Sequence, residues 1–174
     1  MNHADHVALL QGGISAGSGE IWADFGSGTG AFTLALADLI GPAAVIYSID
    51  KDRGALAQQE RLMRDRFPQT TVHYLAADFT QPIQLPPLNG LVIANALHFH
   101  RNPDRLVAQL RAYLAPGANV MFAHPLNNSL GAGGRAGATP ALAPGASVEA
   151  PPPESISQRD LFGPQPVRLL FTPR

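Results

Sequence analysis

Three alternating glycines follow an acidic residue in the stretch Asp24-Phe25-Gly26-Ser27-Gly28-Thr29-Gly30. The apolar run before this stretch and the apolar helical pattern after it indicate a buried strand that turns sharply into a helix. Glycine at Gly26 and Gly28 allows a positive φ and lets a ligand approach the main chain more closely than any Cβ would permit. The stretch therefore predicts a loop that binds a cofactor.

A polar side chain lies at the end of each of the first four expected strands. In chain order these residues are Asp24, Asp50, Asp78 and Asn95. Ligands of an open parallel sheet bind at the carboxyl ends of the strands, beside the point where the strand order reverses. Any one of these side chains alone would be read as a helix cap or a solvated turn. Four of them at one edge, beside a glycine loop, favour a shared ligand.

The positions of the acidic residues indicate the charge of that ligand. Asp24 stands directly before the loop, where a carboxylate would repel a pyrophosphate but attract an ammonium group. Asp78 lies near the far end of the site and is suited to accept a hydrogen bond from an exocyclic amine or a ribose hydroxyl. We therefore expect a ligand that carries positive charge and no phosphate.

A nicotinamide site is the main alternative. The pattern Gly26-x-Gly28-x-x-Ala31 also fits the dinucleotide signature G-x-G-x-x-G/A, and Asp50 lies about where a ribose-binding acid is expected. An NAD(P)-dependent oxidoreductase therefore stays open as a second interpretation, which the carboxylate of Asp24 opposes.

Alternating strands and helices must position these residues. We expect strands over residues 20–25, 44–49, 71–76, 91–94 and 119–123, and helices over residues 5–13, 29–40, 54–67 and 103–114. Several strands are apolar on both faces, as in buried parallel sheets. The pattern predicts an α/β fold: a Rossmann-like doubly wound parallel sheet in three α/β/α layers. Asp5 is the expected N-cap of the first helix, and Leu56, Leu62 and Met63 are the expected core residues of the third.

The composition limits the partners of the chain. With 174 residues, 45% of them hydrophobic and 14% charged, the chain can bury one core. A net charge of -1 gives no basic footprint for a nucleic acid. The absence of cysteine excludes disulfides and thiolate catalysis, and no apolar run is long enough to span a bilayer. We expect a cytoplasmic protein without a membrane or nucleic-acid partner.

These features together resemble the class I S-adenosylmethionine-dependent methyltransferases. The stretch from Asp24 to Gly30 matches the first motif of that family, E/D-x-G-x-G-x-G, which is fairly specific where it links a strand to a helix. The resemblance extends from Glu20 to about Pro125 and implies S-adenosylmethionine as the cofactor. It implies that the methionine moiety and the ribose are surrounded by Asp24, Phe25, Gly26, Ser27, Gly28 and Gly30.

The resemblance also implies roles for residues after the later strands. Asp50 would hold the two ribose hydroxyls, and Lys51 would line the adenine side. Asp78 would accept a hydrogen bond from the adenine amino group, with Phe79 against the ring. Asn95 begins a segment similar to the fourth motif of the family, where the methionine end meets the substrate.

Methyl transfer from a sulfonium needs few catalytic side chains, because aligning the acceptor and excluding water supply most of the acceleration. His98 is the candidate for a general base, and a loop histidine packed over the cofactor is its alternative role. His98 and His100 lack a third ligand for a metal, so no metal site is expected. No Asn/Asp-Pro-Pro-Tyr/Phe motif follows the fourth strand, which leaves a small-molecule acceptor as the default.

The chain departs from the family after its fifth strand. Residues 1–127 are expected to form the Rossmann-like core, and residues 128–174 form a low-complexity tail with altered or missing C-terminal strands. The segment from about Asn128 to Gln158 is too poor in apolar periodicity to offset its ordering entropy, so we expect disorder there. Val167 to Thr172 could add one edge strand.

A shifted reading frame would account for the unusual composition of this tail. Related chains, as the resemblance implies, often continue with Asn-Pro-Trp-Val-Pro, and with ordinary codons a one-base shift after Asn128 would give Pro-Trp-Val-Pro. We therefore hypothesise a frameshift from about Ser129, which resequencing of the gene tests. A non-catalytic, truncated cofactor-binding fragment is then a further alternative.

Overall fold

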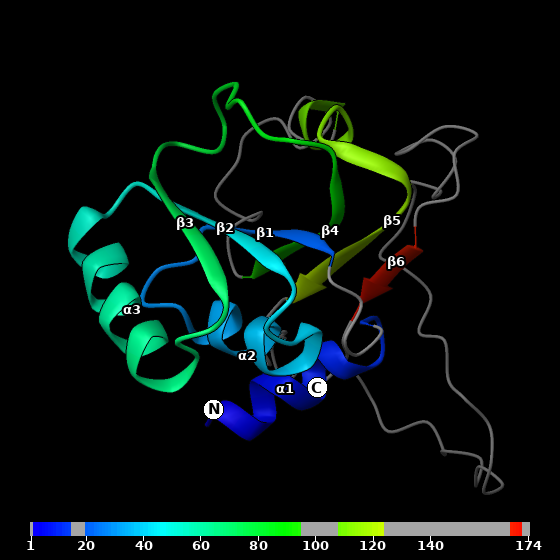
Figure 1. Cartoon of the computed structure of the whole chain (residues 1–174). Helices are drawn as coiled ribbons and strands as arrows, with labels where there is room; N and C mark the ends of the chain where they lie inside the picture. Colours follow the sequence, from blue (N-terminus) through cyan, green and yellow to red (C-terminus); the bar gives the residue numbers. More distant parts are fainter. Residues whose placement is uncertain (1, 15–19, 95–107, 124–167, 172–174) are drawn as a thin grey trace, which may run out of the picture.

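The fold is given by a computed structural model that describes residues 2–14, 20–94, 108–123 and 168–171 (Figure 1). Its elements are α1 (His3–Gln11), β1 (Ile21–Phe25), α2 (Ala31–Ile40), β2 (Val45–Asp50), α3 (Arg53–Arg66), β3 (Thr71–Ala76), β4 (Leu88–Ala94), β5 (Leu114–Ala123) and β6 (Arg168–Phe171). All neighbouring strands are parallel, in the order β3-β2-β1-β4-β5-β6. The predicted Rossmann-like sheet is confirmed, and its strand order reverses between β1 and β4.

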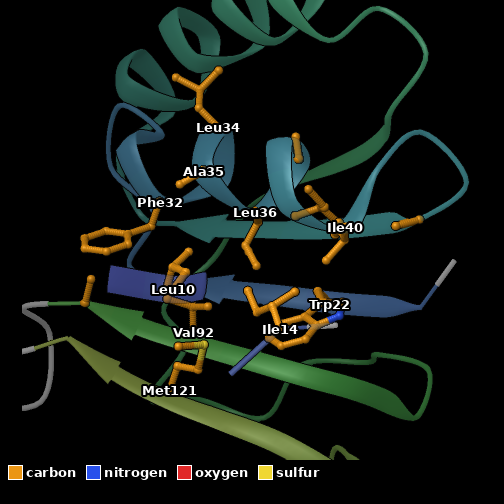
Figure 2. Packing of buried hydrophobic residues seen from close by; sticks show 14 of the residues in the cluster. Leu10, Ile14, Trp22, Phe32, Leu34, Ala35, Leu36, Ile40, Val92 and Met121 are labelled. Carbon is orange, nitrogen blue, oxygen red and sulfur yellow. The ribbon is translucent and has the colours of Figure 1, made fainter. Parts of the chain in front are cut away.

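The three long helices cover one face of the sheet (Figure 1). Trp22 of β1 and Val92 of β4 are fully buried on this face, against Leu36 and Ile40 of α2 and Leu10 of α1 (Figure 2). Burying a large apolar side chain stabilises the folded state by about 1.5–3 kcal/mol. This apolar layer therefore fixes α2, and with it the loop that leads into α2, against the sheet.

A second apolar cluster covers the opposite face. Phe25 of β1 and Leu91 of β4 are fully buried there, together with Leu110 from the helical residues 108–111. The connection between β3 and β4 packs on the same cluster through partly buried residues such as Phe79. The sheet is thus covered on both sides, as the three-layer prediction requires.

The strands of the site come from distant parts of the chain. β1 pairs with β2 on one side and with β4 on the other. A side chain strengthens the second pairing, because Asn89 Oδ1 accepts a hydrogen bond at 3.0 Å from the Ile21 amide, 68 residues earlier in the chain. The reversal point between β1 and β4 therefore depends on long-range contacts.

Two local predictions were wrong. Asn2, and not Asp5, is the N-cap of α1, and Asp5 completes a capping box by accepting from the Asn2 amide at 2.7 Å. Leu62 is 37% exposed, and the buried face of α3 carries Leu56, Gln59 and Met63 instead. The buried positions 56, 59 and 63 are spaced by three and four residues, and Leu62 lies at the edge of that stripe, six residues from Leu56 and one from Met63.

The end of the sheet also differs from expectation. β5 begins at Leu114, where a helix was predicted to end, five residues before the predicted start of the strand at residue 119. The register between β4 and β5 shifts between Leu88 and Gly90, which accommodates this irregular stretch. β6 confirms the edge strand and pairs with β5 from within the segment 128–174. The predicted disorder lies outside the described residues, as does most of the predicted helix 103–114.

Candidate cofactor-binding site

The glycine loop after β1 requires its glycines. Gly26, Gly28 and Gly30 have φ values of 74°, 53° and 89°, which are strained for residues with a side chain. A Cβ on Gly28 would meet nothing within 4 Å, so the space above it is open for a ligand. A Cβ on Gly30 would lie 2.3 Å from Cγ of Gln59, so Gly30 is also needed for close packing against α3.

Several amide groups of this loop already have acceptors within the protein. The amides of Gly26 and Ser27 donate to the carbonyl of Ile49 at 2.8 and 3.1 Å. The amide of Gly28 donates to Oδ2 of Asp50 at 2.8 Å. A diphosphate on a glycine loop depends on free amide donors, and these three amides are not available for it.

Asp24 is the buried acidic residue of the site. It lies in β1, is 1% exposed, and accepts a hydrogen bond from the Thr33 hydroxyl of α2 at 2.7 Å through Oδ2. Its other oxygen, Oδ1, has no hydrogen-bond donor among the described residues. The pKa of Asp24 is raised from 3.8 to about 7, chiefly because burial disfavours the charged form; the bond from Thr33 opposes this rise and the charge of Asp50 adds to it. A cation beside Oδ1 would stabilise the carboxylate.

Asp50 connects the glycine loop to the start of α3. While Oδ2 holds the Gly28 amide, Oδ1 accepts from the amide of Asp52 at 2.8 Å. Asp52 in turn caps α3 by accepting from the amides of Gly54 and Ala55. A carboxylate offers about four lone pairs, and Asp50 is only partly buried, so it can accept further bonds from a ligand.

Asp78 and Phe79 follow β3. Asp78 is exposed, and its Oδ1 accepts from the amide and the hydroxyl of Thr80 at 2.9 and 2.7 Å. Phe79 is half-buried, with its ring 5.8 Å from that of Phe25. The Nε2 group of Gln109 donates to the Phe79 carbonyl at 2.9 Å. These contacts restrain an aromatic residue and an acidic residue just after the outer strand β3.

The sheet brings the predicted residues of the first three strands to one edge. β1, β2 and β3 are adjacent and parallel, so Asp24, Asp50 and Asp78 lie at or just after neighbouring carboxyl ends. Lys51 is exposed directly after Asp50. The Phe25 side chain is fully buried and lies under this edge.

The remaining residues that the sequence predicts for the site cannot be placed in the described part of the chain. Asn95, His98 and His100 lie outside the described residues. Within the described ranges, no group of three or more histidine or acidic side chains could hold a metal ion. No helix in the described part of the chain has the length and apolar character needed to cross a bilayer.

Three buried polar residues of the site escaped the sequence analysis. Thr33 holds Asp24, and Ser48 lies between Ser27 and Gln59, with oxygen distances of 2.7 and 3.0 Å. Ser48 is a polar interruption of an apolar strand, and Gln59 falls on the apolar face of its helix. Those two interruptions were the signals that could have revealed them.

Comparison with known proteins places this arrangement in a family. Residues 23–120 match a family described as a methyltransferase domain. No curated protein matches the chain. Among solved structures, an S-adenosylmethionine-dependent methyltransferase from Aquifex aeolicus has 20% identity and a TM-score of 0.55 over 64% of this chain and 59% of its own.

Two further solved structures have a similar fold. Coclaurine N-methyltransferase, bound to N-methylheliamine and S-adenosylhomocysteine, has 17% identity and a TM-score of 0.59 over 66% of this chain and 33% of its own. Mitomycin 7-O-methyltransferase has 15% identity and a TM-score of 0.58 over 72% of this chain and 37% of its own.

The chain thus aligns with only 33 to 59% of the length of these three proteins. The structural likeness supports the fold, and the family match covers more than half of the 174 residues. The resemblance drawn from the glycine motif is confirmed. This chain belongs to the methyltransferase-domain family, with the Rossmann-like fold of the class I S-adenosylmethionine-dependent enzymes.

Proposed function

We propose that this chain binds S-adenosylmethionine at the carboxyl edge of β1, β2 and β3 and transfers its methyl group to a small-molecule acceptor. One observation carries the proposal. The loop amides of Gly26, Ser27 and Gly28 are already bonded within the protein, while Oδ1 of the buried Asp24 has no donor in the part of the chain that the structure describes. Such a site suits a cationic ligand without phosphate, and S-adenosylmethionine has both properties.

The remaining residues accommodate the parts of that ligand. The ammonium group would lie beside Asp24, directly or through one water, and the ribose hydroxyls would donate to Asp50. Asp78 would accept from the adenine amino group, with Phe79 against the ring and exposed Lys51 on the same side. Asn95 would contact the methionine end. The open space above Gly28 allows the close approach that this placement needs.

In this proposal the chain promotes methyl transfer mainly by orienting the ligand, and only to a small extent through reactive side chains. Bound S-adenosylmethionine supplies an electrophilic methyl group on a sulfonium. The carboxylates hold the ligand at fixed points, and the apolar layers beneath the loop exclude water from one side. His98 stays the proposed base for acceptors that are protonated in their ground state.

The acceptor class is supported by charge and by analogy. The net charge of -1 does not favour a nucleic-acid partner. Two of the structurally similar enzymes are named for small acceptors, coclaurine and mitomycin. We therefore propose a small organic acceptor, and a cytoplasmic location in keeping with a cysteine-free chain.

The oxidoreductase alternative is less well supported. Tyr47 and Lys51 have the Tyr-x-x-x-Lys spacing of a catalytic pair, but they lie along β2 and directly after it. Residues four apart meet on a helix and not on an extended strand. The ring of Tyr47 instead stacks on His73, with centroids 4.8 Å apart.

Calorimetry distinguishes the alternatives. S-adenosylhomocysteine and NADH are titrated separately into the purified chain. We expect S-adenosylhomocysteine to bind and NADH to give no heat beyond dilution. Binding of NADH alone would overturn the proposal, and binding of neither compound would favour a non-catalytic fragment.

Replacing Asp50 by Ala should weaken S-adenosylhomocysteine binding by roughly 1.5–3 kcal/mol for each ribose hydrogen bond lost, because the acceptor is charged. The same titration measures it, with urea unfolding to confirm that the variant is folded. Asp65→Ala is the control, since Asp65 is exposed on α3. An unchanged affinity of the Asp50 variant would show that the ribose binds elsewhere.

A further inference from the structure

The buried polar side chains of the described residues gather in one place. They belong to five residues, Asp24, Ser27, Thr33, Ser48 and Gln59. All of them lie between the sheet and the helices α2 and α3, at or beneath the glycine loop. The rest of the described core is apolar. The buried polar side chains are therefore found only beside the glycine loop within the described residues.

Gln59 is the member of this layer that comes from α3. Its side chain is fully buried between Leu56 and Met63 on the apolar face of the helix. Its Oε1 lies 3.0 Å from the Ser48 hydroxyl, which lies 2.7 Å from the Ser27 hydroxyl in the loop. A polar chain therefore runs from α3 through β2 to the first half of the loop.

The stem of Gln59 makes a second contact with the loop. Its Cγ and Cδ would lie 2.3 and 2.7 Å from a Cβ placed on Gly30. The side chain therefore sits directly against the glycine that begins α2. Gln59 thus contacts the loop directly at Gly30 and is linked to Ser27 through the Ser48 hydroxyl, so its two connections lie on either side of Gly28.

Packing alone does not explain a glutamine at this position. Its Nε2 has no acceptor among the described residues, and an unpaired buried donor is unfavourable. Methionine has a similar shape and could fill the same space without that cost. The hydrogen bond to Ser48 is what a methionine would lack.

We propose that Gln59 is a positioning residue for the cofactor loop: it holds Ser27 and Gly30 in the arrangement that accepts the ligand above Gly28. This inference rests on the proposed binding of S-adenosylmethionine. It assigns to α3, a helix outside the glycine motif, a part in setting the affinity of the site.

Gln59→Met tests the polar half of this role. We expect its affinity for S-adenosylhomocysteine to fall by about 3- to 10-fold, the effect of losing one neutral hydrogen bond. Ser48→Ala should have a similar effect, and the double variant should lose little more, because both changes break the same chain.

Leu56→Ala is the matched control. Leu56 is 5% exposed on the same helix face but has no place in the polar chain. This variant should unfold more readily than Gln59→Met, yet bind with wild-type affinity at temperatures where both are folded. A loss of affinity equal to that of Gln59→Met would reduce Gln59 to a stabilising role and overturn the inference.

A second readout separates this inference from the proposed function. Amide hydrogen exchange of Gly28 in the free protein should be faster in Gln59→Met than in Leu56→Ala, since only the former loosens the loop. If wild type fails to bind S-adenosylhomocysteine, the proposed function fails, and this exchange measurement still tests Gln59. If wild type binds and Gln59→Met binds equally well, only the role of Gln59 is lost.

Discussion

We expect Asp24→Asn to lower the affinity for S-adenosylhomocysteine by about 100-fold near pH 8, which corresponds to about 3 kcal/mol. The reason is the buried position of the carboxylate, whose Oδ1 has no hydrogen-bond donor among the described residues and would accept from the ammonium group in the proposed binding mode. An amide keeps the size of the side chain but removes its charge. Isothermal titration of wild type, Asp24→Asn and the exposed control Asp65→Asn measures the effect. Equal affinities for all three would place the ammonium elsewhere.

The same substitution should make the free protein more stable in alkaline solution. Because the folded pKa of Asp24 is raised from 3.8 to about 7, wild-type stability falls as the pH rises through this interval and is lowest above it. The full difference corresponds to roughly 4 kcal/mol. Asp24→Asn cannot ionise, so its advantage in the free energy of unfolding should grow between about pH 4 and pH 7.

Urea unfolding across this pH range measures that advantage. Parallel pH profiles for wild type and Asp24→Asn would contradict the burial of an ionisable group. The opposite signs expected for binding and for stability are characteristic of a residue retained for its ligand and not for the fold.

Gly30→Ala should destabilise the fold by about 2–5 kcal/mol and abolish binding. A left-handed conformation costs about 1–2 kcal/mol for a residue with a side chain, and forcing an extra methyl group into a packed site costs about 1–3 kcal/mol more. Both apply here, because Gly30 has a φ of 89° and its Cβ would lie 2.3 Å from Gln59.

Gly28→Ala is the matched comparison. Its φ is 53°, but its Cβ would meet nothing within 4 Å. We expect a loss of stability of only about 1–2 kcal/mol, from the backbone alone. Binding should nevertheless fail, because the methyl group would occupy the space of the ligand. Chemical denaturation and titration of both variants test the difference, and equal losses of stability would refute it.

The strands and the residues at their carboxyl ends were predictable from the local pattern of apolar and polar residues in the sequence. The strand predicted over residues 71–76 has those bounds in the structure. The acidic residues at or just after the ends of three strands reach one edge of the sheet because parallel strands all point the same way. Tertiary packing decided the rest: the buried stripe of α3 includes Gln59 in place of Leu62.

Interactions between distant segments gave no sequence signal. The bond from the Gly28 amide to Asp50 joins residues 22 positions apart, and no local pattern reveals it. The irregular register between β4 and β5 is of the same kind, since it arises only when the two strands meet. The position of the acidic side chains at one edge of the sheet was predictable, whereas the internal bonding of the loop amides was not.

The hydrogen bond from the Ile21 amide to Asn89 has a consequence for synthesis of the chain. A nascent polypeptide that has emerged only through Asp50 already carries Asp24 and every glycine of the motif. It lacks the fourth strand, however, and must still lose the entropy of closing a 68-residue span before β1 gains its second neighbour. The carboxyl edge of the sheet, and with it the proposed ligand site, therefore forms late, after translation has passed Ala94.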